Sequence, residues 1–186
     1  MLVDSPRAAK PLLRRLEELG GVRYMFLTHR DDVAFHRVFR EHFGCERILH
    51  EDDISIDTSD VERRVRGREP LALADDLLLL PVPGHTRGSV ALLFRDEYLF
   101  SGDHLSYSSE DEMLDAHPRV CWYSWTEQVR SVERLLDYRF RWLLPGHGEP
   151  VRADSPSAMH DMLVHWLDAN EDRTARLNRR RARRRG

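Results

Sequence analysis

Short apolar segments typical of strands alternate along the chain with amphipathic segments typical of helices. Strands are expected at Met1–Asp4, Tyr24–Leu27, Arg47–His50, Leu77–Val82, Ser89–Phe94, Tyr98–Phe100 and Arg141–Leu144. Helices are expected from Ser5-Pro6 to Gly20, from Asp31 or Asp32 to Phe43, over Trp125–Tyr138 and over about 155–176, with one helical turn near Val61–Val65. Because both kinds of element must bury an apolar face, the alternation predicts a sheet covered by helices.

Length and composition favour one folded domain without a membrane segment. The chain has 186 residues, 41% of them hydrophobic, which is enough for one sizeable core. No apolar run approaches the roughly 18 residues of a membrane span, and the start lacks the basic and apolar regions of a secretory signal. Cys45 and Cys121 lie far apart and indicate neither a disulfide framework nor a thiolate metal cluster. A cytoplasmic protein is expected.

The net charge of −3 hides a basic tail on an acidic body. Residues 173–186 contain eight arginines, which leaves 21 basic against 32 acidic groups, or −11, in residues 1–172. We therefore expect a folded domain over 1–172 and a basic, disordered tail over 173–186. An acidic body repels phosphates, so nucleic acid is an unlikely partner despite the tail.

Four potential metal ligands follow four of the expected strands. His29, His85, Asp103 and His147 each stand just after an apolar run, and three of them are flanked by glycine. Imidazole and carboxylate groups are ligands for zinc and related ions, and glycine allows the tight turns that aim them. If the strand ends meet at one rim of a sheet, these side chains form a metal site.

The loops that carry these residues resemble those of a known family. Gly84–Ser89 (GHTRGS), Gly102-Asp103 and Pro145–Gly148 (PGHG) look like the histidine and aspartate loops of the metallo-β-lactamase superfamily, glyoxalase II-like members included. Asp4 matches an early aspartate of that fold, and Thr28-His29 the start of its first histidine motif. The resemblance implies an α+β, four-layer αββα sandwich and one or two metal ions, zinc above all, with iron or manganese as alternatives. It also implies a hydrolase acting on an ester, thioester, lactone or similar small substrate.

The first histidine motif departs from the family pattern T-H-x-H-x-D-H. Asp31 stands where the second histidine is usual, while Val33 and Ala34 replace the following aspartate and histidine. We expect Asp31 to join His29 and His85 at a first metal, since a carboxylate is an acceptable ligand.

The second metal would then be held by His147 with Asp32 or His36, which are spaced four residues apart on the expected helix. Asp103 would bridge the two ions, and Asp32 and Asp103 are the expected catalytic residues. The alternative is that Asp31 or Asp32 only caps the helix and that His36 lies on the surface.

The chain also starts closer to Asp4 than the family pattern leads one to expect. Members usually have several strands before the equivalent of Asp4, so N-terminal strands are apparently missing. Truncation is the favoured explanation, and completion of the sheet by a partner subunit, hence a homo-oligomer, is the alternative.

A bound divalent ion would lower the pKa of a water molecule and polarise the bond to be cleaved. The extra negative charge of Asp31 would make that ion a weaker Lewis acid, favour iron or manganese, and slow hydrolysis or move it to higher pH. A catalytically weak or inactive protein that serves metal binding or protein interaction is the alternative function.

Three further features leave alternatives open. The aromatic residues Trp122, Tyr123 and Trp125 are expected to fill the core rather than line a substrate pocket. His104 is expected to point away from the cleft, with a proton shuttle as the alternative. Arg87 is expected to be a surface residue unless it meets an anionic substrate.

Overall fold

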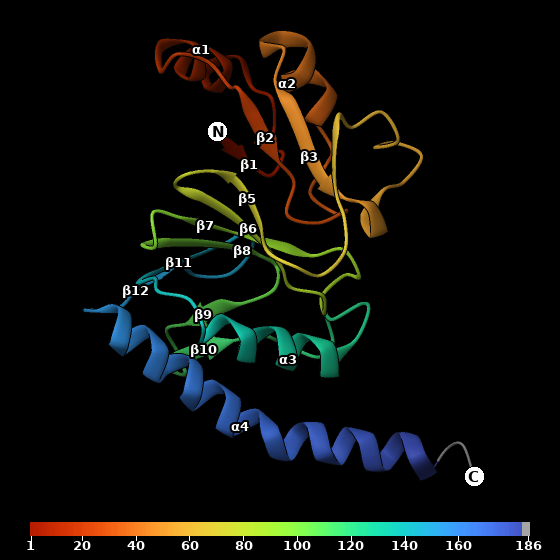
Figure 1. The fold of residues 1–186 in the computed structure, drawn as a ribbon, viewed down its shortest axis with the longest axis vertical. Helices are drawn as coiled ribbons and strands as arrows, with labels where there is room; N and C mark the ends of the chain where they lie inside the picture. Colours follow the sequence, from red (N-terminus) through yellow and green to blue (C-terminus); the bar gives the residue numbers. More distant parts are fainter. Residues whose placement is uncertain (184–186) are drawn as a thin grey trace.

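The computed structural model describes the backbone of residues 1–183 and the side chains of residues 1–170. Within them, two sheets pack face to face and each carries two helices on its outer side (Figure 1). The first half contains α1 (Lys10–Glu18), α2 (His36–Phe43) and a sheet in the order β1 (Leu2–Val3), β2 (Tyr24–Phe26), β3 (Glu46–His50) and β4 (Arg63–Val65).

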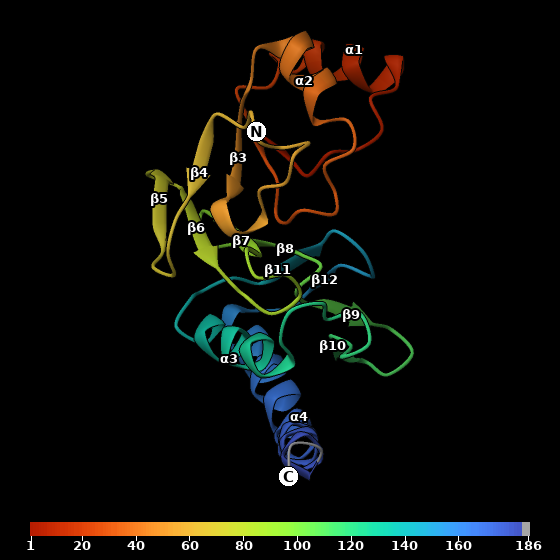
Figure 2. The same ribbon diagram turned by 90° about the vertical axis from the view of Figure 1, so that its right-hand side faces the viewer.

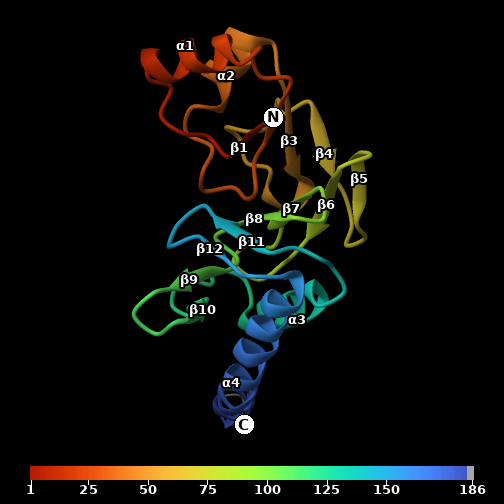
Figure 3. The same cartoon turned by 90° about the vertical axis from the view of Figure 1, so that its left-hand side faces the viewer.

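The second half has a larger sheet. Its order is β12 (Val151–Arg152), β11 (Trp142–Pro145), β8 (Tyr98–Gly102), β7 (Val90–Phe94), β6 (Leu77–Pro81) and β5 (Leu71–Ala74), and it is covered by α3 (Trp125–Leu135) and α4 (Pro156–Arg183). A small hairpin of β9 (Ser106–Ser108) and β10 (Met113–Asp115) lies beside α3 and α4 (Figure 2). The predicted α+β, four-layer αββα sandwich is therefore confirmed, with the helices at opposite ends of the stack (Figure 3).

Three apolar cores hold the four layers together. The central core joins the two sheets, and its buried members are Phe26, Ile48, Val65, Leu79, Val90 and Leu92. Adjacent residues point the other way, because successive side chains of a strand face opposite sides. Thus Met25 and Leu49 pack toward α1 and α2, while Leu80 packs toward α3 and α4. Central strands buried on both faces explain why the apolar runs are continuous rather than alternating.

The direction of three strands matters for the site. β7 runs antiparallel to both β6 and β8, and β11 runs parallel to β8. The C-terminal ends of β6, β8 and β11 therefore lie at the same edge of the larger sheet.

Several expected element boundaries are wrong. α1 begins at Lys10, with Pro11 in its first turn, rather than at Ser5-Pro6, because the Ser5 hydroxyl instead accepts a hydrogen bond from the Phe35 amide at 2.9 Å. α2 begins at His36, so Asp31 and Asp32 precede the helix and do not cap it.

The helical turn expected near Val61–Val65 is instead strand β4, which pairs in parallel with β3. The valines at the two ends of this segment belong to different cores: Val61, which precedes β4, lies beside the helices, and Val65 lies between the sheets. The short elements η1 (Glu51–Asp53), β5, β9, β10 and β12 were not anticipated.

The helices of the described residues bear on the expected absence of a membrane segment, and α4 extends into the segment expected to be a disordered tail. None of the helices there combines the length and the apolar character needed to cross a membrane. The helix α4 runs as far as Arg183, whereas residues 184–186 of the basic segment lie outside the described residues. The disorder expected over 173–186 stays a prediction.

A charge cluster of Arg47, Glu62 and Arg40 connects β3 to the start of β4. The Arg47 guanidinium on β3 is almost fully buried and donates to both carboxylate oxygens of Glu62, at 2.9 and 3.0 Å. Burial by itself raises the pKa of Glu62, but hydrogen bonds from Arg47 and Arg40 outweigh it and lower the pKa to about 2. The charged form of Glu62 therefore stabilises this edge of the first sheet.

Replacement of Glu62 by glutamine should lower the free energy of unfolding at pH 7 by about 2 kcal/mol, because it removes the anion that accepts two hydrogen bonds from buried Arg47 and leaves only the ion pair with Asp60. The folded-state pKa of Glu62 is depressed, so its contribution is complete above about pH 4.5 and disappears as the pH falls through about 2. Urea unfolding of wild type and Glu62→Gln at pH 7 and pH 3 measures this. Glu41→Gln, on the exposed side of α2, should change stability by less than about 0.5 kcal/mol. An equal loss at both pH values would contradict the assignment.

Candidate metal centre

Six side chains converge at the edge where β6, β8 and β11 end. His85 follows β6, Asp103 follows β8 and His147 follows β11. The first sheet contributes His29, after β2, and the irregular segment before α2 contributes Asp31 and Asp32. The sequence prediction that strand ends gather potential ligands thus agrees with the geometry.

Two buried imidazoles each lie close to the same two carboxylates. The Nε2 atoms of His29 and His85 lie 3.9 and 3.8 Å from Asp31 Oδ2, and 3.6 and 3.8 Å from Asp103 Oδ2. A tetrahedral ion with bonds of about 2.0–2.1 Å separates its ligand atoms by about 3.3–3.4 Å. A contraction of a few tenths of an ångström would bring each imidazole to this separation from each carboxylate, and His29, Asp31 and His85 already place their ligand atoms within 4.8 Å of one another.

A second group shares Asp103. His147 Nδ1 lies 2.9 Å from Asp103 Oδ1 and 3.7 Å from Asp32 Oδ2, and His29, Asp32 and Asp103 also bring donor atoms within 4.8 Å of one another. The position of Asp103 between the two groups suits a bridging ligand. Asp31 thus lies with the first group and Asp32 with the second.

The buried histidines have ring nitrogens that the protein leaves without hydrogen bonds and that a cation could bind. Within the described residues, the Nε2 atoms of His29 and His85 are buried without a hydrogen-bond partner. Unpaired buried polar atoms are costly, and lone pairs aimed at carboxylate oxygens suit a shared cation. Burial, together with the nearby His29, lowers the pKa of His85 and keeps its imidazole neutral, as a metal ligand must be.

A hydrogen-bonded chain behind His29 selects its tautomer. Thr28 Oγ1 donates to Asp4 Oδ1 at 2.8 Å, so the hydroxyl oxygen accepts from His29 Nδ1 at 3.0 Å. The proton of His29 is thereby held on Nδ1 and the Nε2 lone pair faces the site. Burial raises the pKa of Asp4 to about 6 against the opposing effect of the Thr28 hydrogen bonds, so at pH 7 this carboxyl remains a predominantly ionised acceptor.

Glycine permits two of the close approaches. Gly102 has a φ of +54°, and a side chain there would strike Thr28. A Cβ at Gly146 would lie 2.9 Å from Asp103 Oδ1. The small residues next to the ligands thus leave room for the carboxylate and the hydroxyl that orient them.

The structure does not bring His36 to this cluster. His36 begins α2, is buried, and accepts at Nδ1 from Arg47 Nη1 at 2.9 Å, in the charge cluster described above. The expected four-residue spacing with Asp32 on one helix fails because Asp32 precedes the helix. Of the two residues expected to join His147 at a second metal, only Asp32 lies in the cluster, and the expectation for His36 is wrong.

Two other side chains near the site are also placed. His104 is buried and lines neither of the two cavities at the site, and burial lowers its pKa to about 3. Arg87 is exposed and its Nε lies 3.3 Å from Asp52 Oδ2.

A buried aspartate that the sequence analysis missed ties two ligand loops together. Asp53 accepts hydrogen bonds from the Thr86 hydroxyl at 2.5 Å, the Gly88 amide at 2.9 Å and the Arg30 amide at 3.1 Å. These donors flank His85 and His29, so one carboxylate fixes both loops. Three consecutive acidic residues follow the expected strand at 47–50, but their sequence does not reveal that only the third is buried.

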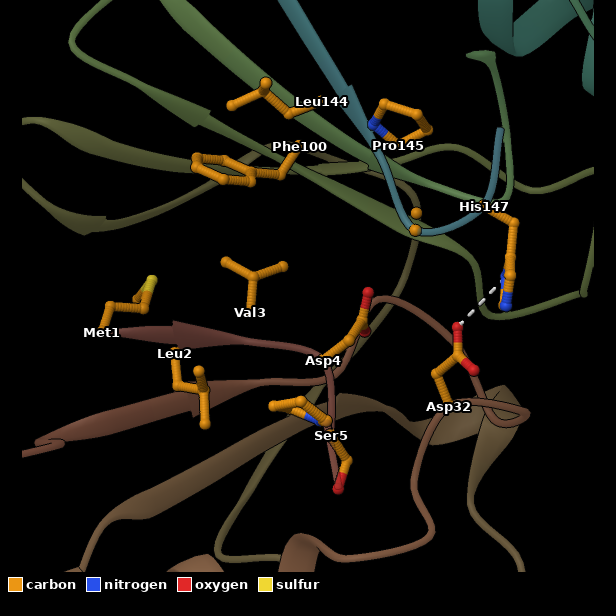
Figure 4. A pocket seen from close by; sticks show the side chains of 13 residues that line it. Met1, Leu2, Val3, Asp4, Ser5, Asp32, Phe100, Leu144, Pro145 and His147 are labelled. Atoms are coloured by element: carbon orange, nitrogen blue, oxygen red, sulfur yellow. Dashed lines mark ion pairs between the residues drawn. The ribbon is translucent and has the colours of Figure 1, made fainter. Parts of the chain in front are cut away.

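Cavities open on both sides of the cluster. One, of about 530 Å³, runs from Asp32 and His147 past Asp4 to the exposed edge of β1, where Val3 faces Phe100 and Leu144 (Figure 4). The other, of about 430 Å³, contacts Asp31, His85, Asp103 and His147 from the side of the β9–β10 hairpin. The donor cluster thus borders both cavities, and the second is lined by more of its members.

Replacement of Asp53 by asparagine should weaken metal affinity by about tenfold or more, because an amide cannot accept from all three donors that orient the His85 and His29 loops. Competition with a chromogenic chelator measures the affinity. Asp52→Asn provides the neighbouring control, since Asp52 contacts Arg87 and lies outside this network. If Asp53→Asn binds metal with wild-type affinity and Asp52→Asn binds it more weakly, then Asp52 rather than Asp53 orients the ligand loops.

Comparisons with known proteins show what the chain is similar to. The sequence matches no protein-family model. It is 26% identical over 163 residues to a hydroxyacylglutathione hydrolase of Xanthomonas campestris pv. campestris (strain B100), across 86% of this chain and 60% of the relative. The chain thus spans about three fifths of the length of the curated relative it matches.

Solved structures extend the likeness to the fold. A metallo-beta-lactamase family protein from Thermus thermophilus aligns with a TM-score of 0.61 and 20% identity, covering 94% of this chain and 72% of that one. TTHA1623, solved in a di-iron-bound form, aligns with a TM-score of 0.62 and 20% identity, covering 86% of each chain. The predicted resemblance is confirmed: the chain has the fold of the metallo-β-lactamase superfamily.

Proposed function

We propose that this protein is a metal-dependent hydrolase that cleaves an ester, thioester, lactone or similar small substrate. The observation that carries the proposal is that the buried Nε2 atoms of His29 and His85 lie within 3.9 Å of carboxylate oxygens of Asp31 and Asp103, beside an open cavity. The relative named as a hydroxyacylglutathione hydrolase supports the same class of reaction. When bound, a divalent ion supplies a Lewis acid and lowers the pKa of a water molecule.

The chain's own residues have separate roles in this proposal. His29 and His85 bind the first ion through Nε2, and Asp31 and Asp103 bind it through Oδ2. Asp103, Asp32 and His147 are available to a second ion. Asp4 and Thr28 hold the His29 proton at Nδ1, which leaves Nε2 ready to ligate without rearrangement.

Metal identity belongs to the same proposal. Two imidazoles with two carboxylates form a mixed nitrogen and oxygen set, which accepts zinc as well as iron or manganese. The di-iron form of TTHA1623 supports iron as an alternative to zinc. The alternative of a non-catalytic interaction protein is not favoured, because it gives no reason for buried donors to converge beside a cavity.

Metal content should depend on Asp103 and Asp31. Purified wild type should contain at least one divalent transition metal per chain, and Asp103→Ala should lose most of it because both donor groups use this carboxylate. Asp31→Ala should weaken the first site, and Asp161→Ala on α4, an exposed control, should match wild type. Elemental analysis measures the stoichiometry. Unchanged metal in Asp103→Ala would remove the basis for the proposed function.

Exchange of Asp31 for histidine should move hydrolysis to lower pH by about one unit, because the neutral ligand makes the metal-bound water more acidic. The same change should raise the preference for zinc over iron or manganese. Rate profiles against pH on a panel of thioesters, lactones and phosphoesters, together with metal competition, give both readouts. If Asp32→His produces the shift and Asp31→His does not, the ligand assignments of the two aspartates are exchanged.

A further inference from the structure

The cavity beside the donor cluster has an apolar wall formed by Leu105, Ala116, Val120 and Trp122. The remaining lining residues are polar side chains and Gly148: the possible ligands Asp31, His85, Asp103 and His147, together with Ser106, Asp115 and His117. The expectation that the aromatic residues fill the core is wrong for two of them. Trp125 is buried at 5% exposure, but Trp122 is 62% exposed and Tyr123 is 44% exposed.

The position of Trp122 is fixed although its side chain is exposed. Its amide donates to the His85 carbonyl at 2.8 Å, and the Ser124 amide donates to the Gly84 carbonyl at 3.0 Å. The indole ring lies edge-on to the His85 ring, with 6.4 Å between their centroids. The backbone that carries this indole is therefore held to the same loop that presents a proposed metal ligand.

An exposed indole held in this way is a ready surface for an apolar group. Covering it removes apolar area from water, and the hydrogen-bonded backbone reduces the ordering that binding requires. Val120 extends the surface, because it is 52% exposed and lines the same cavity. Leu105, which is buried and lies two residues after Asp103 in the sequence, also lines this cavity.

We propose that Trp122 and Val120 bind an aryl or medium-chain aliphatic group of the substrate, so that the preferred substrates are hydrophobic esters, thioesters or lactones. This inference rests on the proposed function, since the metal ligands define which bond of the substrate is presented. The apolar wall then sets the orientation, with the acyl carbonyl toward the donor cluster and the hydrocarbon part on the indole.

The kinetic test uses two thioesters of N-acetylcysteamine, acetyl and phenylacetyl, with the metal-loaded protein. Wild type should prefer the phenylacetyl compound in kcat/KM, and Trp122→Ala should lower that preference about tenfold, mainly through KM. Trp122→Phe should restore most of the preference, because a phenyl ring still offers an aromatic face. Tyr123→Ala is the matched control: its side chain is exposed but does not line the cavity, so the preference should stay as in wild type.

A binding test separates this inference from the proposed hydrolysis. Calorimetric titration with acetohydroxamate and phenylacetohydroxamate compares two ligands that share a metal-binding group and differ only in the phenyl ring. The phenyl compound should bind wild type about tenfold more tightly, and this ratio should fall toward one in Trp122→Ala.

If wild type hydrolyses neither thioester but keeps the hydroxamate ratio, the proposed function fails and the apolar subsite stands. An unchanged ratio in Trp122→Ala overturns the subsite, as does wild-type protein that binds both hydroxamates equally or binds neither. The subsite is also overturned if Tyr123→Ala lowers the preference for the phenyl compounds as much as Trp122→Ala does. Tyr123 does not line the cavity, so the effect would then not come from binding within it.

Discussion

Burial of the two sheets against each other is the constraint on which the site depends. Phe26 and Ile48 from the first sheet and Leu79 and Leu92 from the second are almost fully buried between the layers. This contact holds the end of β2 against the ends of β6, β8 and β11. Donors that are distant in sequence therefore meet only when the central core is packed, which couples the metal site to the global fold.

Carboxylates that do not face the ligand cluster directly organise it. Asp4 acts through Thr28 on the His29 ring, and Asp53 joins the loops of His29 and His85. Both are held largely away from water and accept several hydrogen bonds, so each supplies fixed geometry where a loop alone would be mobile. The backbone of Asp4 also adopts a φ of 57°, a strained value that the surrounding contacts enforce.

The sequence reveals the donors more clearly than the residues that orient them. His85, Asp103 and His147 are predictable because each follows an apolar strand and sits beside glycine. Asp31 is expected at the site because the family pattern places a ligand two residues after the equivalent of His29. The expectation for His36 is wrong because a spacing of four residues indicates a shared face only if both residues are helical, and α2 begins at His36. Asp53 and the exposure of Trp122 depend on contacts between distant segments, so local pattern cannot predict them.

The central claim is that two histidines and two aspartates from three separate loops hold one divalent ion. A crystal structure of the zinc-loaded protein, with anomalous diffraction recorded at the zinc edge, tests it most directly. We expect an anomalous peak about 2.0–2.2 Å from the Nε2 atoms of His29 and His85 and from carboxylate oxygens of Asp31 and Asp103. A fully loaded crystal whose only peaks lie away from these four side chains would contradict the account.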